Sequence, residues 1–339
     1  MPRYRKLLVS VLVLALFAIA LAWLLYRHAA QPPEIARLLP EGDVLVYANV
    51  KPIHLWESGQ SKPTHIEGDY QSFIDQTGIQ LERDLDEAAM SRRDTPDGHD
   101  TESTEILSGR FDPQRLKSWL VKTSAQRDSY HNRIIFLIPH EGHAVRVCVL
   151  DQKRVAVTNM ASSDPMHEII DGADKPPQGP SLLQSYYQQV PLASLAWLII
   201  RTGSGSQRPQ MPNGWSFDFL ESTTTVGSLR YKGDLLLRAE VIAASDNAAK
   251  NVMDSASSFL SMYRAVAQSL GAHGTDPDVK AAIDSIQVQQ NKNVAVFTAT
   301  LSQRFLKKLV SEAQSEAAVA SPSPSPAPRH RRRPDRRLH

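Results

Sequence analysis

The residues best suited to metal chemistry form the tetrapeptide His140-Glu141-Gly142-His143. Two imidazoles three residues apart can bind one metal ion, and the carboxylate between them could assist. The zincin pattern, however, spaces its histidines four apart on a helix, whereas this tetrapeptide follows Pro139 and lies between two predicted strands. The pattern therefore favours a solvent-exposed hairpin turn over a zinc site, and we predict no metal ligands.

An acidic segment, DTPDGHDTE at residues 94–102, has a composition that suits calcium, because four carboxylates surround a glycine. The EF-hand loop requires acids at positions one, three and five and glycine at position six, and this segment does not have that register. The pattern favours a polar hairpin loop. Weak calcium binding at extracellular concentrations is the alternative.

Patterns for phosphate binding and nucleophilic catalysis are incomplete. Gly203-Ser204-Gly205-Ser206 follows a predicted strand but lacks the GK[ST] ending of a phosphate loop, and no serine lies in a G-x-S-x-G elbow. The single cysteine, Cys148, alternates with valines and is predicted to be a buried strand residue rather than a nucleophile. We therefore predict no catalytic residues and no cofactor, although a triad assembled from distant residues stays open.

The C-terminal tail is the strongest candidate for an interaction. SPSPSPAP at residues 321–328 is a semi-rigid spacer that cannot form a core, and RHRRRPDRRLH follows it. Each arginine near an anionic membrane contributes about 1 kcal/mol. A disordered tail that contacts anionic headgroups, an anionic envelope polymer or a protein partner is expected, and a solubilising tail without a partner is the alternative. The candidate contacts are Arg329, Arg331, Arg332, Arg333, Arg336 and Arg337.

At the other end of the chain, Leu7 to Tyr26 is a run of twenty residues without a charge. A helix of that length crosses about 30 Å, the hydrocarbon thickness of a bilayer. Arg3, Arg5 and Lys6 precede the run, which by the positive-inside rule places the N-terminus in the cytoplasm. We predict a single-pass anchor in contact with membrane lipid in a bacterial inner membrane, with a periplasmic or extracellular body. The alternative is a signal peptide cleaved after Ala22.

The charge distribution limits the partners of the body. The formal net charge is +2, but the basic residues concentrate at both ends of the chain, so the region between them is mildly acidic. A nucleic-acid surface needs basic residues clustered on a folded face, and we therefore predict no nucleic-acid partner. The overall composition, 42% hydrophobic and 22% charged residues, is typical of a globular domain.

Hydrophobic periodicity divides this body into two units with a similar order of elements: strand, helix, hairpin, helix, hairpin, helix. The predicted regions are 1–30 (cytoplasmic stub and transmembrane anchor), 34–174 (first α+β unit), 175–181 (linker), 182–318 (second α+β unit) and 319–339 (disordered tail). Strands are expected at 43–50, 88–93, 105–110, 133–138, 144–150, 154–158, 195–200, 222–231, 235–242, 285–289 and 294–300. Helices are expected at 70–77, 113–123, 246–270, after Asp164-Pro165 and after Ser302.

The predicted fold class is α+β, with an N-terminal transmembrane helix, two similar units of mainly antiparallel sheet with helices on one face, and a disordered tail. We interpret the similarity of the units as an internal duplication, against the alternative of ordinary alternation of strands and helices.

Three phrases carry a resemblance: IARLLPEGDVLVYANVKPI, IDQTGIQLERDLDEAA and LSGRFDPQRLKSWL. With them the chain resembles uncharacterised bacterial single-pass membrane-anchored proteins that contain a domain of unknown function. The resemblance covers the first half of the exported body. It implies the architecture and supplies no catalytic residues.

These observations predict an envelope protein that is a non-catalytic binding or scaffolding module. A membrane-anchored periplasmic hydrolase is the first alternative and requires a pocket with convergent His, Asp or Ser residues. The second alternative is a lipid-binding module, which requires a dry apolar cavity between the two units.

Overall fold

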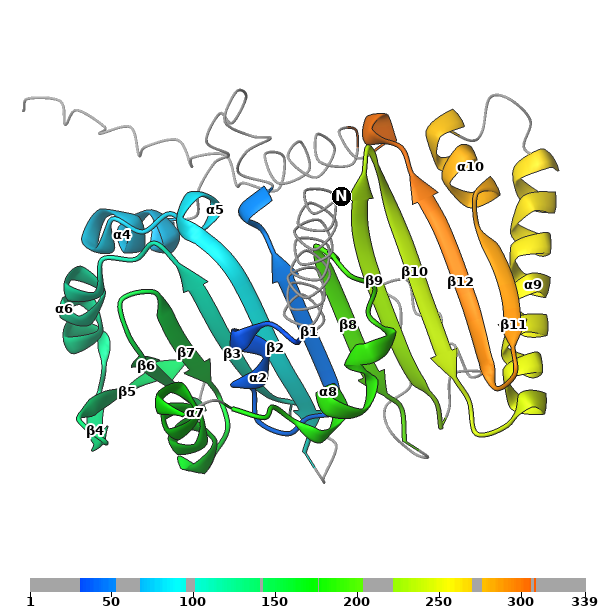
Figure 1. The fold of residues 1–339 in the computed structure, drawn as a ribbon. Coiled ribbons are helices and arrows are strands. Elements are labelled where there is room, and N and C mark those ends of the chain that lie inside the picture. Colours follow the sequence, from blue (N-terminus) through cyan, green and yellow to red (C-terminus); the bar gives the residue numbers. More distant parts are fainter. Residues whose placement is uncertain are drawn as a thin grey trace, which may run out of the picture.

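The computed structural model describes residues 31–52, 68–95, 101–140, 143–175, 177–203, 222–269, 276–305 and 308. Their centre is one antiparallel sheet of twelve strands in the order β11-β12-β10-β9-β8-β1-β2-β3-β7-β6-β5-β4 (Figure 1). The strands are β1 (Val44–Asn49), β2 (Leu85–Asp94), β3 (Thr101–Gly109), β4 (Gln126–Tyr130), β5 (Arg133–His140), β6 (His143–Val149), β7 (Arg154–Thr158), β8 (Ala196–Arg201), β9 (Thr224–Lys232), β10 (Asp234–Ile242), β11 (Gln287–Asn291) and β12 (Val294–Leu301).

Helices cover parts of both faces of this sheet. They are α2 (Glu34–Arg37), α4 (Gly68–Thr77), α5 (Leu81–Asp84), α6 (Pro113–Thr123), α7 (Asp164–Asp174), α8 (Ser181–Tyr186), α9 (Asp246–Ser269) and α10 (Pro277–Asp284), with a 3-10 turn at Tyr187–Gln189. Because side chains alternate along a strand, the residues of one row across the sheet point to the same face.

The face that we call the α8 face holds the largest core. Leu45 of β1, Trp197 and Ile199 of β8 and Val226 of β9 are almost fully buried there with residues of α2, α7 and α8. Two loop contacts tie α8 to the segment after α2, since Glu41 accepts hydrogen bonds from the backbone and the side chain of Ser181, both at 2.7 Å. The predicted linker 175–181 therefore runs directly into packed structure.

The opposite face, which we call the α9 face, holds two smaller cores. At one end, α4 and α6 pack on Phe136 of β5 and Val147 of β6. At the other end, Val252 of α9 packs on Val241 of β10 and Ala295 of β12. On the α9 face, the strands between these two cores line the cavity described below.

Local signals in the sequence explain where the helices begin. The Asp112 carboxylate accepts hydrogen bonds from the backbone N–H groups of Gln114 at 3.0 Å and Arg115 at 3.1 Å, and Pro113 follows at the first helical position. This is the cap expected for α6, and it is confirmed. Asp276 caps α10 in the same way through the N–H of Asp278, although no helix was expected at these residues.

The predicted fold class was wrong in its architecture. Strand β1 of the first predicted unit pairs with β8 of the second, with Val44 opposite Ile200 and Ala48 opposite Ala196, so the two units share one continuous sheet. Helices also lie on both faces rather than on one. The physical reason is that β1 and β8 are both rich in β-branched and aromatic residues, and pairing them removes two sheet edges.

The transmembrane part of that fold class is likewise not what the structure shows. Across the described ranges, no helix is long and apolar enough to cross a membrane. The longest of them, α9, is amphipathic and packs on the sheet. The predicted span, Leu7 to Tyr26, lies outside the described residues, as does the tail 319–339.

Candidate binding cavity

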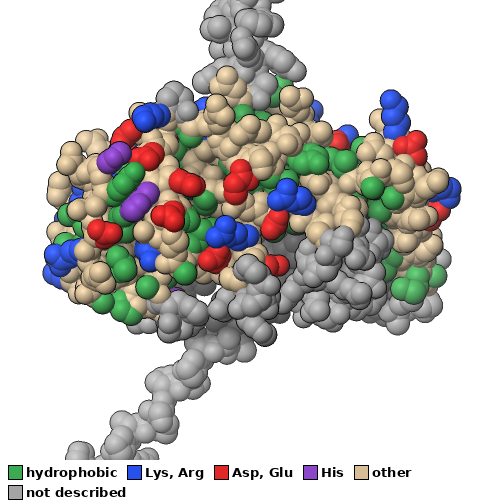
Figure 2. All heavy atoms as spheres, turned by 90° about the horizontal axis from the view of Figure 1, so that it is seen from below, with side chains coloured by type: hydrophobic (Ala, Val, Ile, Leu, Met, Phe, Trp, Pro, Cys, Tyr) green, Lys and Arg blue, Asp and Glu red, His purple; other side chains and the backbone are tan. Residues whose placement is uncertain are grey.

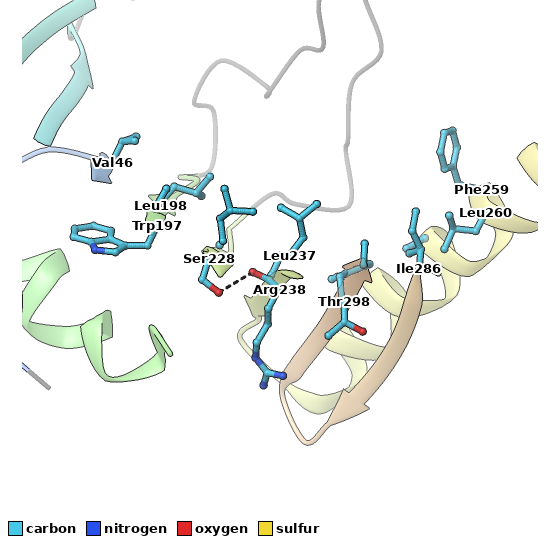
Figure 3. Close-up of a pocket in the computed structure, with 17 residues that line it drawn as sticks. Val46, Trp197, Leu198, Ser228, Leu237, Arg238, Phe259, Leu260, Ile286 and Thr298 are labelled. Atoms are coloured by element: carbon cyan, nitrogen blue, oxygen red, sulfur yellow. Dashed lines mark hydrogen bonds between the residues drawn. The ribbon is translucent and has the colours of Figure 1, made fainter. Parts of the chain in front are cut away.

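A cavity of about 510 Å³ lies between the α9 face of the sheet and α9 itself (Figure 3). It extends from Val46 of β1 across β8, β9 and β10 to Phe297 of β12, and α9 closes one side of it. Its volume lies within the range typical of small-molecule sites, about 300–1,000 Å³.

Strand register brings the lining residues together. Val46 lies opposite Leu198, Leu198 opposite Gly227, Gly227 opposite Ala239, and Ala239 opposite Phe297. These five residues form one row across five strands, and a row of directly paired residues points to one face of a sheet. The row forms the floor of the cavity.

Small side chains in this row leave room beneath the helix. Gly227 has ordinary strand backbone, so its lack of a side chain matters for packing and not for turn geometry. A Cβ atom at residue 227 would lie 3.0 Å from Cγ of Leu198. The glycine therefore lets the Leu198 side chain lie close to the sheet. Ala239, the residue paired with Gly227, has only a methyl group and takes up little of the space above the sheet.

The helical wall comes from one stripe of α9. Ala256, Phe259 and Leu260 line the cavity at the spacing i, i+3, i+4 that places residues on one helix face. Farther along the helix, Arg264 donates hydrogen bonds to the carbonyl oxygens of Ile283 at 3.2 Å and Ile286 at 3.1 Å. These bonds hold α9 against the junction of α10 and β11, where Ile286 lines the cavity.

The interior of the cavity carries no charge from the residues that line it. The Arg238 side chain points away from it, and its guanidinium binds the Glu240 carboxylate at 2.6 and 2.9 Å on the α8 face (Figure 3). The Ser228 hydroxyl also points away and donates to the carbonyl oxygen of Arg238 at 3.4 Å. What the cavity offers a ligand is hydrocarbon contact, and one of its lining residues, Leu237, is 38% exposed.

A second candidate site is a cluster of ring systems between the β4–β5 turn and α7. The Tyr130 ring stacks between His131, with centroids 4.3 Å apart, and His167, at 4.0 Å. The Tyr130 hydroxyl donates to Asp171 at 3.2 Å, and Nδ1 of His131 lies 3.1 Å from the same carboxylate. Figure 2 shows histidine and acidic side chains gathered at one end of the face seen from below.

The chemistry of this cluster is limited by exposure. The side chains of His131 and Asp171 are 59% and 43% exposed, so solvent screens the pair. Partial burial and the hydrogen bond to Asp171 raise the pKa of Tyr130 above its ordinary value. These contacts hold the β4–β5 hairpin at the sheet edge against α7, which is a structural role.

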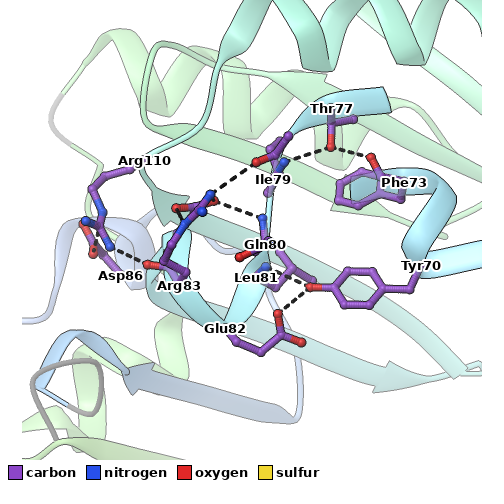
Figure 4. Close-up of polar contacts among 12 residues, drawn as sticks. Tyr70, Phe73, Thr77, Ile79, Gln80, Leu81, Glu82, Arg83, Asp86 and Arg110 are labelled. Atoms are coloured by element: carbon purple, nitrogen blue, oxygen red, sulfur yellow. Dashed lines mark hydrogen bonds and ion pairs between the residues drawn. The ribbon is translucent and has the colours of Figure 1, made fainter. Parts of the chain in front are cut away.

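A third polar network joins α4, α5 and the start of β2 (Figure 4). The Tyr70 hydroxyl accepts from the backbone N–H of Leu81 at 2.9 Å and donates to Glu82 at 2.7 Å. Burial and that bond to Glu82 raise the pKa of Tyr70 to about 12. Asp84 accepts two hydrogen bonds from Arg83, at 2.7 and 2.8 Å, and one from the N–H of Gln80 at 3.0 Å. This network is satisfied internally and fixes the connection between helix and strand.

The structure places the sequence-derived candidates as follows. His140 and His143 pair across the β5–β6 hairpin, which agrees with the predicted turn. Cys148 is fully buried on β6, so its predicted position as a buried strand residue is confirmed, and burial raises the pKa of its thiol to about 11. Within the described ranges, no group of three or more His, Cys, Asp or Glu side chains could hold a metal ion.

The remaining candidates lie outside the described residues, wholly or in part. The acidic loop is described only at its two ends, where Arg93 binds Glu102 at 2.6 Å and Arg92 lies 3.6 Å from Asp94. The serine-glycine segment is described only at Gly203. None of the six candidate arginines of the tail, Arg329, Arg331, Arg332, Arg333, Arg336 and Arg337, falls within the described ranges.

Sequence reasoning missed the cavity residues because each looks like an ordinary core position. One available signal was Gly227, a glycine in the interior of a predicted strand. Such a glycine often marks a place where another group approaches the sheet closely.

Comparisons of this chain with known proteins identify no family and no function. No family model and no curated protein matches the chain. It is similar to solved structures of TP0453: crystal form III at 11% identity and a TM-score of 0.42, covering 84% of this chain and 99% of that one, and crystal form IV at 12% identity and a TM-score of 0.42, covering 83% and 98%. A likeness this distant carries no argument about function.

Proposed function

We propose that this protein is a non-catalytic binding module that holds an apolar ligand in the cavity between the sheet and α9. The observation that carries the proposal is the combination of volume, about 510 Å³, with a lining whose inward-facing side chains are aliphatic or aromatic. Apolar surface that is exposed in an empty cavity gains about 25 cal/mol per Å² when a ligand removes it from water.

The geometry favours binding over the hydrolase alternative. A hydrolase needs a nucleophile, a base and oxyanion donors that converge on one point. Three lining residues, Ser228, Arg238 and Thr298, carry polar side chains, and strand register places all three on the other face. Ser228 and Arg238 have hydrogen-bond partners there. The Tyr130 cluster and the Asp84 network fasten elements together and lie away from the cavity lining.

The test is binding of N-phenyl-1-naphthylamine, a fluorophore whose emission rises in a dry apolar site. We expect saturable binding at one site per chain. Ala239 lies in the cavity floor between Gly227 and Phe297, so Ala239→Phe should fill the space and weaken binding at least tenfold. The matched control is Ala144→Phe, an exposed strand position on β6 that does not line the cavity.

Thermal unfolding of both variants accompanies the titration, so that loss of structure is separated from loss of binding. Equal binding by Ala239→Phe and the control, with both folded, would place the fluorophore elsewhere and overturn the proposal. Absence of saturable binding to the unmodified chain would also overturn it.

The location of the body outside the cytoplasm and the contact of the six tail arginines with an anionic polymer or a protein partner also belong to this proposal. They are supported by the charge segregation of the sequence alone. Subcellular fractionation, and binding of the full chain and of a chain ending at Ala320 to anionic polymers, would test them.

A further inference from the structure

Resting on the proposed function, we infer that the cavity binds one acyl chain of a single-chain lipid, which lies across the strands. Three features of the cavity carry this inference: its capacity, its length and its apolar lining.

The capacity matches one chain. A methylene group takes up about the volume of a water molecule, roughly 30 Å³, so the cavity holds on the order of 16 such groups. A lipid with two chains of that length would need about twice the volume that the cavity offers, 510 Å³.

The length of the cavity also suits an extended chain. It reaches from β1 to β12 across β8, β9 and β10. Neighbouring strands lie about 4.8 Å apart, which gives a path of roughly 19 Å. One leaflet of a bilayer, about 15 Å of hydrocarbon, is the depth that lipid acyl chains normally span. A compact apolar molecule would leave much of such a path empty.

The apolar lining keeps the polar end of the ligand outside the cavity. A buried headgroup needs hydrogen-bond partners, and the inward-facing side chains offer none. Leu237 of β10 lines the cavity and is 38% exposed, so part of the lining meets solvent. The headgroup therefore remains in water, and the chain alone determines affinity.

The floor residues set the length of chain that fits. Leu198 lies over Gly227, and truncating it by Leu198→Ala removes three carbon atoms from the floor. We expect the preferred chain to become about two or three carbons longer, since the space vacated is that of a few methylene groups. Ala239→Phe should shift the preference to shorter chains, and Ala144→Phe should not shift it.

The experiment is native mass spectrometry of the full chain with saturated fatty acids of 8 to 20 carbons, a lysophosphatidylcholine with a 16-carbon chain, and dipalmitoyl phosphatidylcholine. We expect one-to-one complexes with the longer fatty acids and the lysolipid, and none with the two-chain lipid. Affinity should rise about fourfold per methylene up to roughly 16 carbons and then level off.

The outcomes separate this inference from the proposed function. If the fluorophore binds and is blocked by Ala239→Phe, but affinity does not depend on chain length or the two-chain lipid binds equally well, the inference is overturned and the apolar site stands. If neither the fluorophore nor any lipid binds, both fail. Opposite shifts of the preferred length in Leu198→Ala and Ala239→Phe support the inference.

Discussion

Asp84 supplies a quantitative test of how the network at the start of β2 stabilises the fold. Its side chain is 10% exposed and accepts two hydrogen bonds from the Arg83 guanidinium and one from the N–H of Gln80. Asp84→Asn keeps the size but removes the charge. Hydrogen bonds to charged groups contribute about 1.5–3 kcal/mol to stability. Because the Arg83 side chain is 59% exposed, we take the lower part of this range and expect Asp84→Asn to lower the free energy of unfolding by about 2 kcal/mol at pH 7.

The expected pH dependence follows from the direction of the pKa shift. Burial raises the pKa of Asp84, but the hydrogen bonds from Arg83 and Gln80 outweigh that effect and hold it below its ordinary value. The stability that the ionised group contributes is therefore present above the unfolded pKa, about 3.9, and is lost as the pH falls through the folded value. The difference between the two proteins should shrink as the pH is lowered below about 4.

The assay is urea unfolding of both proteins at several pH values between 2.5 and 7, followed by circular dichroism. Asp86→Asn is the matched control, because Asp86 lies 3.8 Å from Arg110 and should contribute less than about 1 kcal/mol. The assignment of the effect to the ionised carboxylate would be refuted by either of two results. One is a loss of unfolding free energy in Asp84→Asn that stays constant down to pH 2.5, and the other is a loss at pH 7 that equals the loss in Asp86→Asn.

Three further changes test the fold. Asp112→Ala removes the cap of α6 and should lower the free energy of unfolding by about 1 kcal/mol, measured in urea, with Asp112→Ser close to the original. Gly179→Ala should cost about 1–2 kcal/mol, because Gly179 has φ +83° and the added Cβ would lie 3.1 Å from Cα of Arg37; an unchanged midpoint would contradict this. Cys148, fully buried with a pKa near 11, should react with Ellman's reagent only after unfolding, and fast reaction in the native state would disprove its burial.

Much of the secondary structure could be predicted from local patterns. Alternation of apolar residues located β1, β5, β6 and β12 to within a few residues, because period-two burial leaves its mark on each strand separately. The strand β4, which carries residues 126–130, was missed. All but the last of these residues are exposed at the sheet edge, so no apolar alternation marks them.

The candidate site was much less predictable. Cys148 and the His140–His143 turn could be placed because their roles depend on immediate neighbours in the chain. The cavity floor joins residues from Val46 to Phe297, and nothing local marks them as neighbours. The general idea of an apolar cavity was formulated as an alternative, but its residues could not be named.

The sequence by itself determined the elements whose causes are local: strand alternation, the Asp112 cap and the acidic charge of the body between two basic ends. Only the tertiary structure decided that β1 and β8 pair, which turns the expected separate sheets into a single one. It also decided that α9 stands over Gly227 and Ala239 with space left between. The pairing of β1 with β8 joins residues more than a hundred positions apart in the chain, and the cavity floor depends on strand register. Long-range pairing and register are both set by the packing of the whole sheet.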